Sequence, residues 1–115
     1  LLIKYAKNQR IPLLGICRGM QVLSKLHGSN LKRVKNHVKN FHKITGVINQ
    51  RVNSFHKYSI LQCPKEFKIT SKSSDGEIES IRHIYLPWEA WMWHPERYKN
   101  YRQKDIKRIK NLFNC

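Results

Sequence analysis

Residues 10–27 read Arg-Ile-Pro-Leu-Leu-Gly-Ile-Cys-Arg-Gly-Met-Gln-Val-Leu-Ser-Lys-Leu-His and carry the clearest fold signal in the chain. The first part is a short continuous apolar run opened by Pro12, which is typical of a strand buried on both faces of a parallel sheet. After the cysteine, apolar residues recur at helical spacing until Gly28, a natural helix stop. A buried strand, a tight turn and a helix in this order indicate an α/β fold.

The segments on either side supply further helices and strands. Upstream, residues 1–9 carry an apolar helical stripe with no N-cap before it, so the chain starts within a helical pattern. Downstream, residues 73–77 contain the hairpin signal Asp75-Gly76. Residues 104–113 predict a closing amphipathic helix. Strands are expected at 10–17, 46–48, 51–53, 67–71, 78–86 and 89–94.

The composition is that of one globular domain with a strong positive charge. The 115 residues include 23 Lys and Arg against 7 Asp and Glu, a net charge of +16. Such a charge attracts polyanions, but the basic residues are scattered and form no nucleic-acid-binding motif. We therefore expect only weak, salt-sensitive binding of nucleic acid, with no specific nucleic-acid partner. A cleft for an anionic small molecule would also benefit from this field.

The sequence offers no signal for a membrane or for a disulfide framework. No apolar run approaches the roughly 18 residues that span a bilayer, and no secretory leader is visible. The three cysteines, Cys17, Cys63 and Cys115, are odd in number and widely spaced. Free thiols in a reducing compartment fit this pattern best, so we expect a cytoplasmic protein.

Cys17 stands in Gly15-Ile-Cys-Arg-Gly19, between the expected buried strand and the helix. A residue there is held on a sharp turn at the carboxyl end of a sheet, and the flanking glycines leave room around it. The positive end of the following helix favours the thiolate, which is the nucleophilic form. We expect these features, together with His94, to lower the pKa of the thiol. The alternative is a small buried hydrophobic residue at a strand end.

A second candidate stretch is Trp93-His-Pro-Glu96. In an extended segment, residues two apart point the same way, so Glu96 can hydrogen-bond one nitrogen of His94 and leave the other to take a proton from a thiol. Alone, the motif is more often an ordinary turn between a strand and a loop. Together with the upstream cysteine it completes a Cys-His-Glu set.

These stretches resemble a known family. Pro12-Leu-Leu-Gly-Ile-Cys-Arg-Gly-Met-Gln21 is similar to the nucleophile segment of class I glutamine amidotransferases, and Trp93–Glu96 to their His/Glu segment. Val52-Asn-Ser-Phe-His-Lys-Tyr58 and Ser74-Asp-Gly-Glu-Ile-Glu79 resemble the γ-glutamyl hydrolase branch, which includes γ-glutamyl-γ-aminobutyrate hydrolase. The resemblance implies a flavodoxin-like, three-layer αβα fold. It also implies cleavage of a γ-glutamyl amide through a thioester, with no metal and no organic cofactor.

The resemblance assigns roles to individual residues. Cys17 would be the nucleophile, His94 the general base and acid, and Glu96 the residue that orients His94. The backbone N–H of Arg18 would be an oxyanion donor. The residues implied to bind the γ-glutamyl group are Gln21, Phe55 and His56. On the residues alone, His56 is a surface loop histidine.

Several other residues are not expected to take part. We interpret His37 and His42 as loop residues and not as ligands, and Cys63 and Cys115 as bystanders. The three tryptophans at 88, 91 and 93 are expected in the core and the pocket wall.

The branch leaves the substrate and the partners open. Similar proteins act in bacterial surface-polysaccharide pathways, and the basic surface favours an anionic or nucleotide-linked amide as substrate. The alternatives are a glutaminase subunit that feeds ammonia to a partner synthetase, a truncated non-catalytic relative and, last, a nucleic-acid binder.

Family members carry further N-terminal strands, with a second oxyanion donor, before the position of Leu1. We therefore expect residues 1–115 to be a partial domain, the C-terminal portion of the fold. The strand ending at Ile16 is expected near the centre of a parallel sheet. A chain that lacks its neighbouring strands is expected to aggregate or to pack loosely, because a central strand needs partners on both sides.

Overall fold

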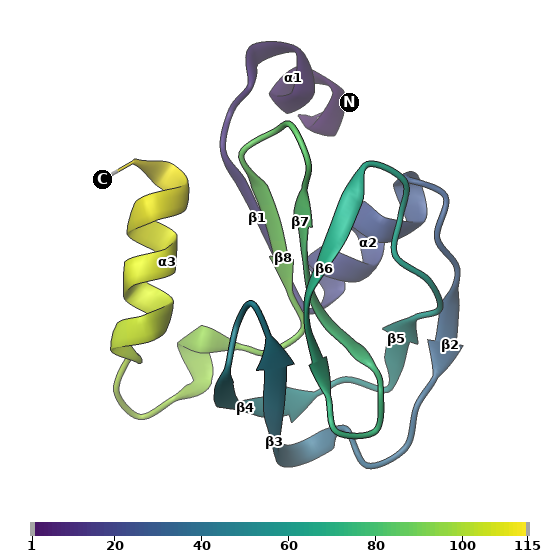
Figure 1. Cartoon of the computed structure of the whole chain (residues 1–115), viewed down its shortest axis with the longest axis vertical. Helices are drawn as coiled ribbons and strands as arrows, with labels where there is room; N and C mark the ends of the chain where they lie inside the picture. Colours follow the sequence, from purple (N-terminus) through teal and green to yellow (C-terminus); the bar gives the residue numbers. More distant parts are fainter. Residues whose placement is uncertain (1, 115) are drawn as a thin grey trace.

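The structure is a computed structural model that describes residues 2–114. The helices are α1 (Leu2–Gln9), α2 (Arg18–Leu26), the 3₁₀ helix η1 (Pro95–Arg97) and α3 (Gln103–Phe113). The strands are β1 (Leu13–Ile16), β2 (Leu31–Arg33), β3 (Val38–Gly46), β4 (Gln50–Phe55), β5 (Tyr58–Ile60), β6 (Phe67–Ser73), β7 (Ile78–His83) and β8 (Trp88–Trp91). Figure 1 shows their arrangement.

The main sheet has six strands in the order β1-β8-β7-β6-β3-β4. Only β1 and β8 pair in parallel, with Ile16 opposite Trp91, and all other neighbours are antiparallel. Among the described residues β1 pairs on one side only, with β8. The expectation that this strand lies near the centre of a parallel sheet in the complete domain stays a prediction. The short strands β2 and β5 form a separate antiparallel pair.

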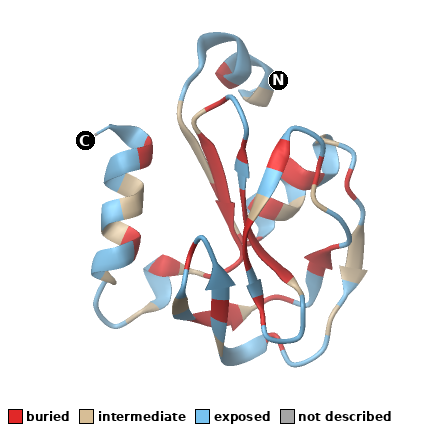
Figure 2. Cartoon of the chain, in the orientation of Figure 1, coloured by how far each residue is buried: buried red, intermediate tan, exposed pale blue. Residues whose placement is uncertain are grey.

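Side chains of β8 and the residues after it alternate between two cores. Trp88, Ala90 and Met92 belong to one hydrophobic cluster, while Trp91 and Trp93 belong to the other. All five side chains are buried, and Figure 2 shows the buried colour concentrated along the strands around β8. This is the two-residue period of a strand covered on both faces, so the expectation that the three tryptophans are core residues is confirmed.

Helices cover both faces of this part of the sheet. Met20 and Leu23 of α2 join the cluster of Trp88, and Ile109 of α3 packs against the cluster of Trp91. Buried Asp105 fastens α3, because its carboxylate accepts hydrogen bonds from Gln50 Nε2 and Trp93 Nε1. The resulting αβα arrangement, with its curled sheet, is the flavodoxin-like fold expected from the sequence.

The polar middle of the chain differs most from the expectation. Residues 38–46 form one long strand, whereas the sequence predicts strands only at 46–48 and 51–53. Most β3 side chains are exposed, so no alternation of apolar and polar residues marks the strand. Backbone pairing with β4 and β6 holds β3 in place.

Gly15 sets how closely β1 approaches α2. A Cβ atom at this position would lie 3.0 Å from the carbonyl carbon and oxygen of Gly19 and 3.1 Å from the nitrogen of Met20. We expect Gly15→Ala to lower the free energy of unfolding by about 1–3 kcal/mol, because backbone must move to accommodate the methyl group. Urea denaturation measures the change.

Gly19→Ala is the matched control, since a Cβ there would meet no atom within 4 Å. In a helix, alanine at an open position stabilises by roughly 0.5–1 kcal/mol over glycine. Equal effects of the two substitutions would contradict the close-approach argument.

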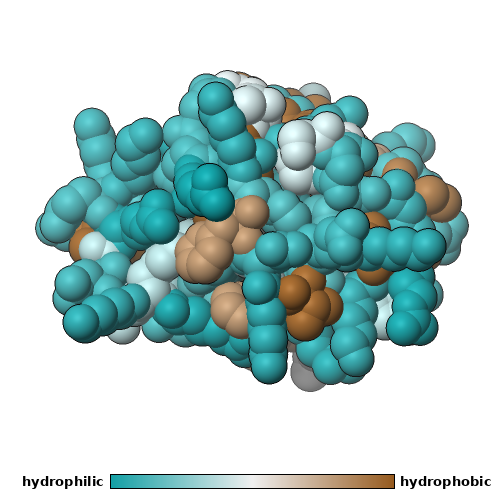
Figure 3. All heavy atoms as spheres, turned by 90° about the horizontal axis from the view of Figure 1, so that it is seen from below, coloured by the Kyte–Doolittle hydropathy of each residue, from teal (hydrophilic) through white to brown (hydrophobic). Residues whose placement is uncertain are grey.

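No helix within residues 2–114 has the length and apolarity required to cross a bilayer. Figure 3 shows a face covered mainly by hydrophilic residues, with hydrophobic residues scattered among them.

Candidate active site

Cys17 occupies the turn between β1 and α2. Its backbone has φ 51° and ψ −99°, a conformation that residues with a side chain rarely adopt. The N–H of Cys17 donates to the carbonyl of Trp91 over 2.7 Å and so extends the pairing of β1 with β8 by one residue. The Cys17 carbonyl accepts from the N–H of Gln21 as α2 begins. Strain of this kind persists only where the surrounding structure enforces it, and it is common in active sites.

The electrostatic environment of Cys17 corrects one expectation. Burial raises the pKa of the thiol, although the backbone N–H of Arg18 and the guanidinium of Arg97 pull it down. The carboxylates of Glu96 and Glu79 raise it further. The predicted lowering of the pKa is therefore wrong for this structure, because the thiol is only 8% exposed and loses hydration. The backbone N–H at the start of α2 acts in the expected direction and Arg97 adds to it, but burial outweighs both.

His94 and Glu96 form the expected pair. His94 Nδ1 lies 2.6 Å from Glu96 Oε2. A carboxylate can only accept, so Nδ1 carries the proton and Nε2 of the neutral ring is left as the base. The intervening backbone differs from the prediction. Only His94 is extended, and the chain then turns into η1, so Glu96 reaches back across one turn.

The surroundings of Glu96 favour the charged form of its carboxyl group. Partial burial pushes the pKa of Glu96 up, but the hydrogen bond from His94 and the charges of His94 and Arg97 lower it below its ordinary value. A lowered pKa stabilises the folded state above the carboxyl's unfolded pKa, and this contribution is lost as the pH falls through the folded value. The His94–Glu96 pair therefore persists at neutral pH.

Asn53, at the centre of β4, holds the backbone of His94. Its side chain accepts from the His94 N–H and donates to the His94 carbonyl, each over 2.8 Å. The Asn53 N–H in turn donates to the hydroxyl of Tyr98 over 3.0 Å. No role for Asn53 is predicted from the sequence. The available signal was an amide side chain inside an expected strand, where asparagine is unfavourable.

The parallel pairing of β1 and β8 brings Cys17 and the His94 segment to the carboxyl ends of these two strands. Cys17 follows β1 directly, and His94 lies three residues after β8, the parallel neighbour of β1. Arg97 and Glu96 are close enough to Cys17 to act on its pKa. Cys17 and the His94–Glu96 pair therefore follow neighbouring strands of the sheet, and their joint action stays a prediction.

Two of the expected substrate-binding residues, Phe55 and Gln21, lie near the carboxyl ends of β1 and β8. The ring of Phe55 packs edge-on against His94, with centroids 6.0 Å apart, and the Arg97 guanidinium lies over its face. Gln21 donates to the carbonyl of Tyr58 and helps to line a pocket of about 250 Å³ along α2. Arg18 and Lys25 also line this pocket, which gives it a cationic wall.

His56 is buried, so its interpretation as a surface histidine is wrong. His37 lies in a loop as expected but is buried, whereas His42 lies in β3, so the interpretation of His42 as a loop residue is wrong. The His56 side chain is 1% exposed and that of His37 is fully buried. His56 Nδ1 donates to the carbonyl of Tyr58, the same oxygen that Gln21 contacts. His56 thus lies behind the pocket wall. Its predicted contact with substrate stays a prediction.

The other positions expected to take no part in the site are His42, Cys63 and Cys115. His42 lies in β3 with its ring 4.2 Å from that of His37, centroid to centroid. Cys63 is half-buried, and burial raises the pKa of its thiol. Cys115 falls outside the described residues.

The fold and the site define the class: α/β proteins in which a cysteine occupies a strained turn between a strand and a helix, with a His-Glu pair beyond the neighbouring strand. Comparison with known proteins gives the family. The model of the class-I glutamine amidotransferase family matches residues 1–113, and the chain belongs to that family.

The relatives include both a hydrolase and a synthase component. The γ-glutamyl-CDP-amidate hydrolase of Campylobacter jejuni is 30% identical over 95 residues, covering 83% of this chain and 48% of that protein. Anthranilate synthase component 2 of Thermococcus kodakarensis is 31% identical over 114 residues, covering 89% and 59%. The chain thus spans about half the length of these relatives.

A solved structure shares the fold. A Thermoplasma acidophilum protein assigned to GMP synthase, as one of its subunits, superposes with a TM-score of 0.81 at 21% identity, covering 96% of this chain and 60% of that one.

Proposed function

We propose that this chain contributes the cysteine-dependent centre that hydrolyses a γ-glutamyl amide. The observation that carries the proposal is the His94–Glu96 pair, which fixes the proton on Nδ1 and leaves Nε2 as a base beyond the strand that adjoins Cys17. Membership of a glutamine amidotransferase family supports the reaction class.

The residues divide the reaction between them. His94 Nε2 takes the thiol proton as the Cys17 sulfur attacks the γ-carbonyl carbon, and the oxygen of the tetrahedral adduct accepts from the Arg18 N–H. The imidazolium then protonates the leaving amine as the C–N bond breaks, which leaves a γ-glutamyl thioester. Water, deprotonated by His94, cleaves the thioester to glutamate and restores the thiol.

The raised pKa of Cys17 favours this coupled proton transfer. A thiol that is protonated at neutral pH needs a general base at the moment of attack, which is the role assigned to His94. The thiol is thereby kept unreactive until substrate brings the groups together.

The pocket beside Gln21 supports an anionic substrate. Arg18 and Lys25 line it, and the chain as a whole carries a net charge of +16. The C. jejuni relative, by its name, cleaves a nucleotide-linked γ-glutamyl amidate. We therefore favour a phosphorylated or nucleotide-linked amine as the leaving group.

The second candidate is a glutaminase subunit that supplies ammonia to a synthetase. The similarity to anthranilate synthase component 2 and to a glutamine-hydrolysing GMP synthase of Methanococcus aeolicus favours this alternative. The two functions share the same centre and differ in whether turnover depends on a partner.

Release of glutamate from γ-glutamyl amides separates the two functions. We expect no measurable turnover by the 115-residue chain alone. Joined to the N-terminal half of a relative, it should turn over without a synthetase and prefer amides with a phosphorylated leaving group. Lys25→Gln should reduce that preference about two- to fivefold, the effect of one exposed charge pair of roughly 0.4–1 kcal/mol. Lys110→Gln, on the outer side of α3, is the control. Turnover that appears only after a synthetase is added would refute the hydrolase assignment.

A further inference from the structure

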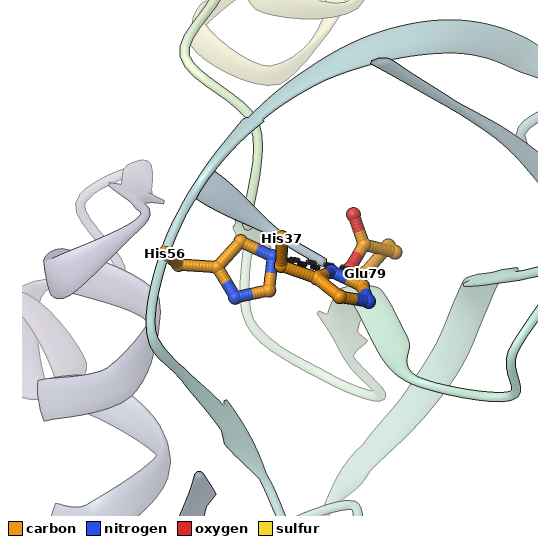
Figure 4. A group of neighbouring side chains, drawn as sticks. All are labelled: His37, His56 and Glu79. Carbon is orange, nitrogen blue, oxygen red and sulfur yellow. Dashed lines mark hydrogen bonds and ion pairs between the residues drawn. The ribbon is translucent and has the colours of Figure 1, made fainter. Parts of the chain in front are cut away.

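His37, His56 and Glu79 converge in the interior from three separate segments (Figure 4). His37 precedes β3, His56 lies between β4 and β5, and Glu79 belongs to β7. All three side chains are at most 1% exposed. His37 and Glu79 have no assigned part in the proposed hydrolysis, and His56 has only its predicted contact with substrate.

Hydrogen bonding among these residues leaves the carboxylate unsatisfied. His37 Nδ1 and His56 Nε2 are 3.1 Å apart, and a hydrogen bond between them requires one of the two rings to carry a second proton. Both oxygens of Glu79 have no hydrogen-bond partner among the described residues. A buried carboxylate is costly unless charge and hydrogen bonds compensate it. The two imidazoles that face Glu79 supply positive charge only when they are protonated.

The distances between the three ligand atoms match a metal site. His37 Nδ1 is 3.7 Å from Glu79 Oε2, and His56 Nε2 is 3.4 Å from the same oxygen. With the 3.1 Å separation of the two nitrogens, these are the edges of one triangular face. A tetrahedral zinc ion with bonds of about 2.0–2.2 Å separates its ligand atoms by roughly 3.3–3.6 Å.

The outer partners of both imidazoles are also those of metal ligands. His37 Nε2 lies 2.7 Å from Asp75 Oδ2, and His56 Nδ1 donates to the carbonyl of Tyr58 over 2.9 Å. A ligating histidine usually donates its other N–H to a carboxylate or a backbone carbonyl, which fixes the ring and the tautomer. In both residues the nitrogen that faces Glu79 is therefore the one free to bind.

We propose that His37 Nδ1, His56 Nε2 and Glu79 Oε2 bind a divalent transition-metal ion of the zinc type. Two imidazoles and a carboxylate are ligands that zinc accepts, and three protein ligands leave one position for water. The ion would join the start of β3, the β4–β5 connection and the β6–β7 hairpin. Through His56 it would also fix the Tyr58 carbonyl that positions Gln21 in the pocket wall.

Zinc and cobalt binding by the 115-residue chain tests the site, with the chain fused to a carrier protein free of metal ligands if that is needed for solubility. We expect one zinc ion per chain retained through desalting. The cobalt form should show the intense visible bands of a tetrahedral site without near-ultraviolet thiolate charge transfer. Cys17→Ser should leave both results unchanged, which separates this site from the proposed catalytic centre.

Substitutions in the cluster give the quantitative readout by competition with a chromophoric chelator. Glu79→Gln keeps the shape of the side chain and should abolish retention of the metal. Asp75→Asn, at the exposed hairpin turn, should weaken affinity about 10- to 100-fold, as loss of an outer-shell carboxylate does elsewhere. His27→Gln is the matched histidine control and should bind as the parent chain does.

Either of two results would overturn the proposal. One is equal zinc affinity for the parent chain, Glu79→Gln and Asp75→Asn, which would place the metal elsewhere or show only loose association. The other is a cobalt spectrum with thiolate charge transfer that disappears in Cys17→Ser. Because Asp75 is about half exposed, its substitution tests the site even if the Glu79 variant fails to fold.

Discussion

Cys17→Ala is expected to lower glutamate release by about 10⁴- to 10⁶-fold, the loss seen when the nucleophile of a comparable hydrolytic centre is removed. The remaining groups can bind and polarise the amide, but no thioester forms. The measurement uses the chain joined to the N-terminal half of a relative. Rapid quenching of the parent should show a γ-glutamyl adduct on the peptide that contains Cys17.

Cys63→Ala is the matched control, since that half-buried thiol has no part in the proposed reaction. It should keep full turnover. Thermal melting of both variants checks folding, and we expect a small change for Cys17→Ala because a thiol-to-methyl change removes little packing. Substantial turnover by Cys17→Ala would exclude Cys17 as the nucleophile.

His94→Ala is expected to lower the rate by about 10²- to 10⁴-fold, the usual contribution of a general acid–base residue. The effect should be largest near neutral pH, since burial raises the pKa of Cys17 and keeps the thiol protonated there. As the pH rises toward the thiol pKa, the thiolate forms without a base and the difference between parent and variant should narrow.

Glu96→Gln should lower the rate of glutamate release by less, about 10²-fold, because Glu96 acts through His94 and its side chain is half exposed. The double variant tests this dependence. If Glu96 only orients His94, the double variant should be no slower than His94→Ala alone. If the rate loss of the double variant equals the product of the two single-variant losses, Glu96 has a role separate from His94.

Local sequence patterns determined the parts of the site that lie close together in the chain. The apolar run and helical spacing around Cys17 predict the strand, turn and helix that the structure contains. The spacing of His94 and Glu96 predicts their contact, which forms even though η1 replaces the expected extended segment. These features depend on a few consecutive residues, so the sequence reports them directly.

Contacts between distant segments decided the rest. Asn53 and His94 are 41 residues apart, and nothing in either segment indicates that the amide will hold the backbone of His94. His37 and His56 look like loop residues in a polar stretch and become buried only because the β6–β7 hairpin brings Glu79 and Asp75 against them. The pKa of Cys17 likewise depends on how much packing removes water from the thiol.

The sequence by itself thus determined the α/β class, the nucleophile turn and the His-Glu pair, because each follows from backbone preference and side-chain direction over a short stretch. Only the tertiary structure decided the pairing of β1 with β8, the burial of the two histidines and the geometry of the His37–His56–Glu79 cluster. Those properties depend on which strands pair and what they cover, and pairing is a property of the whole chain.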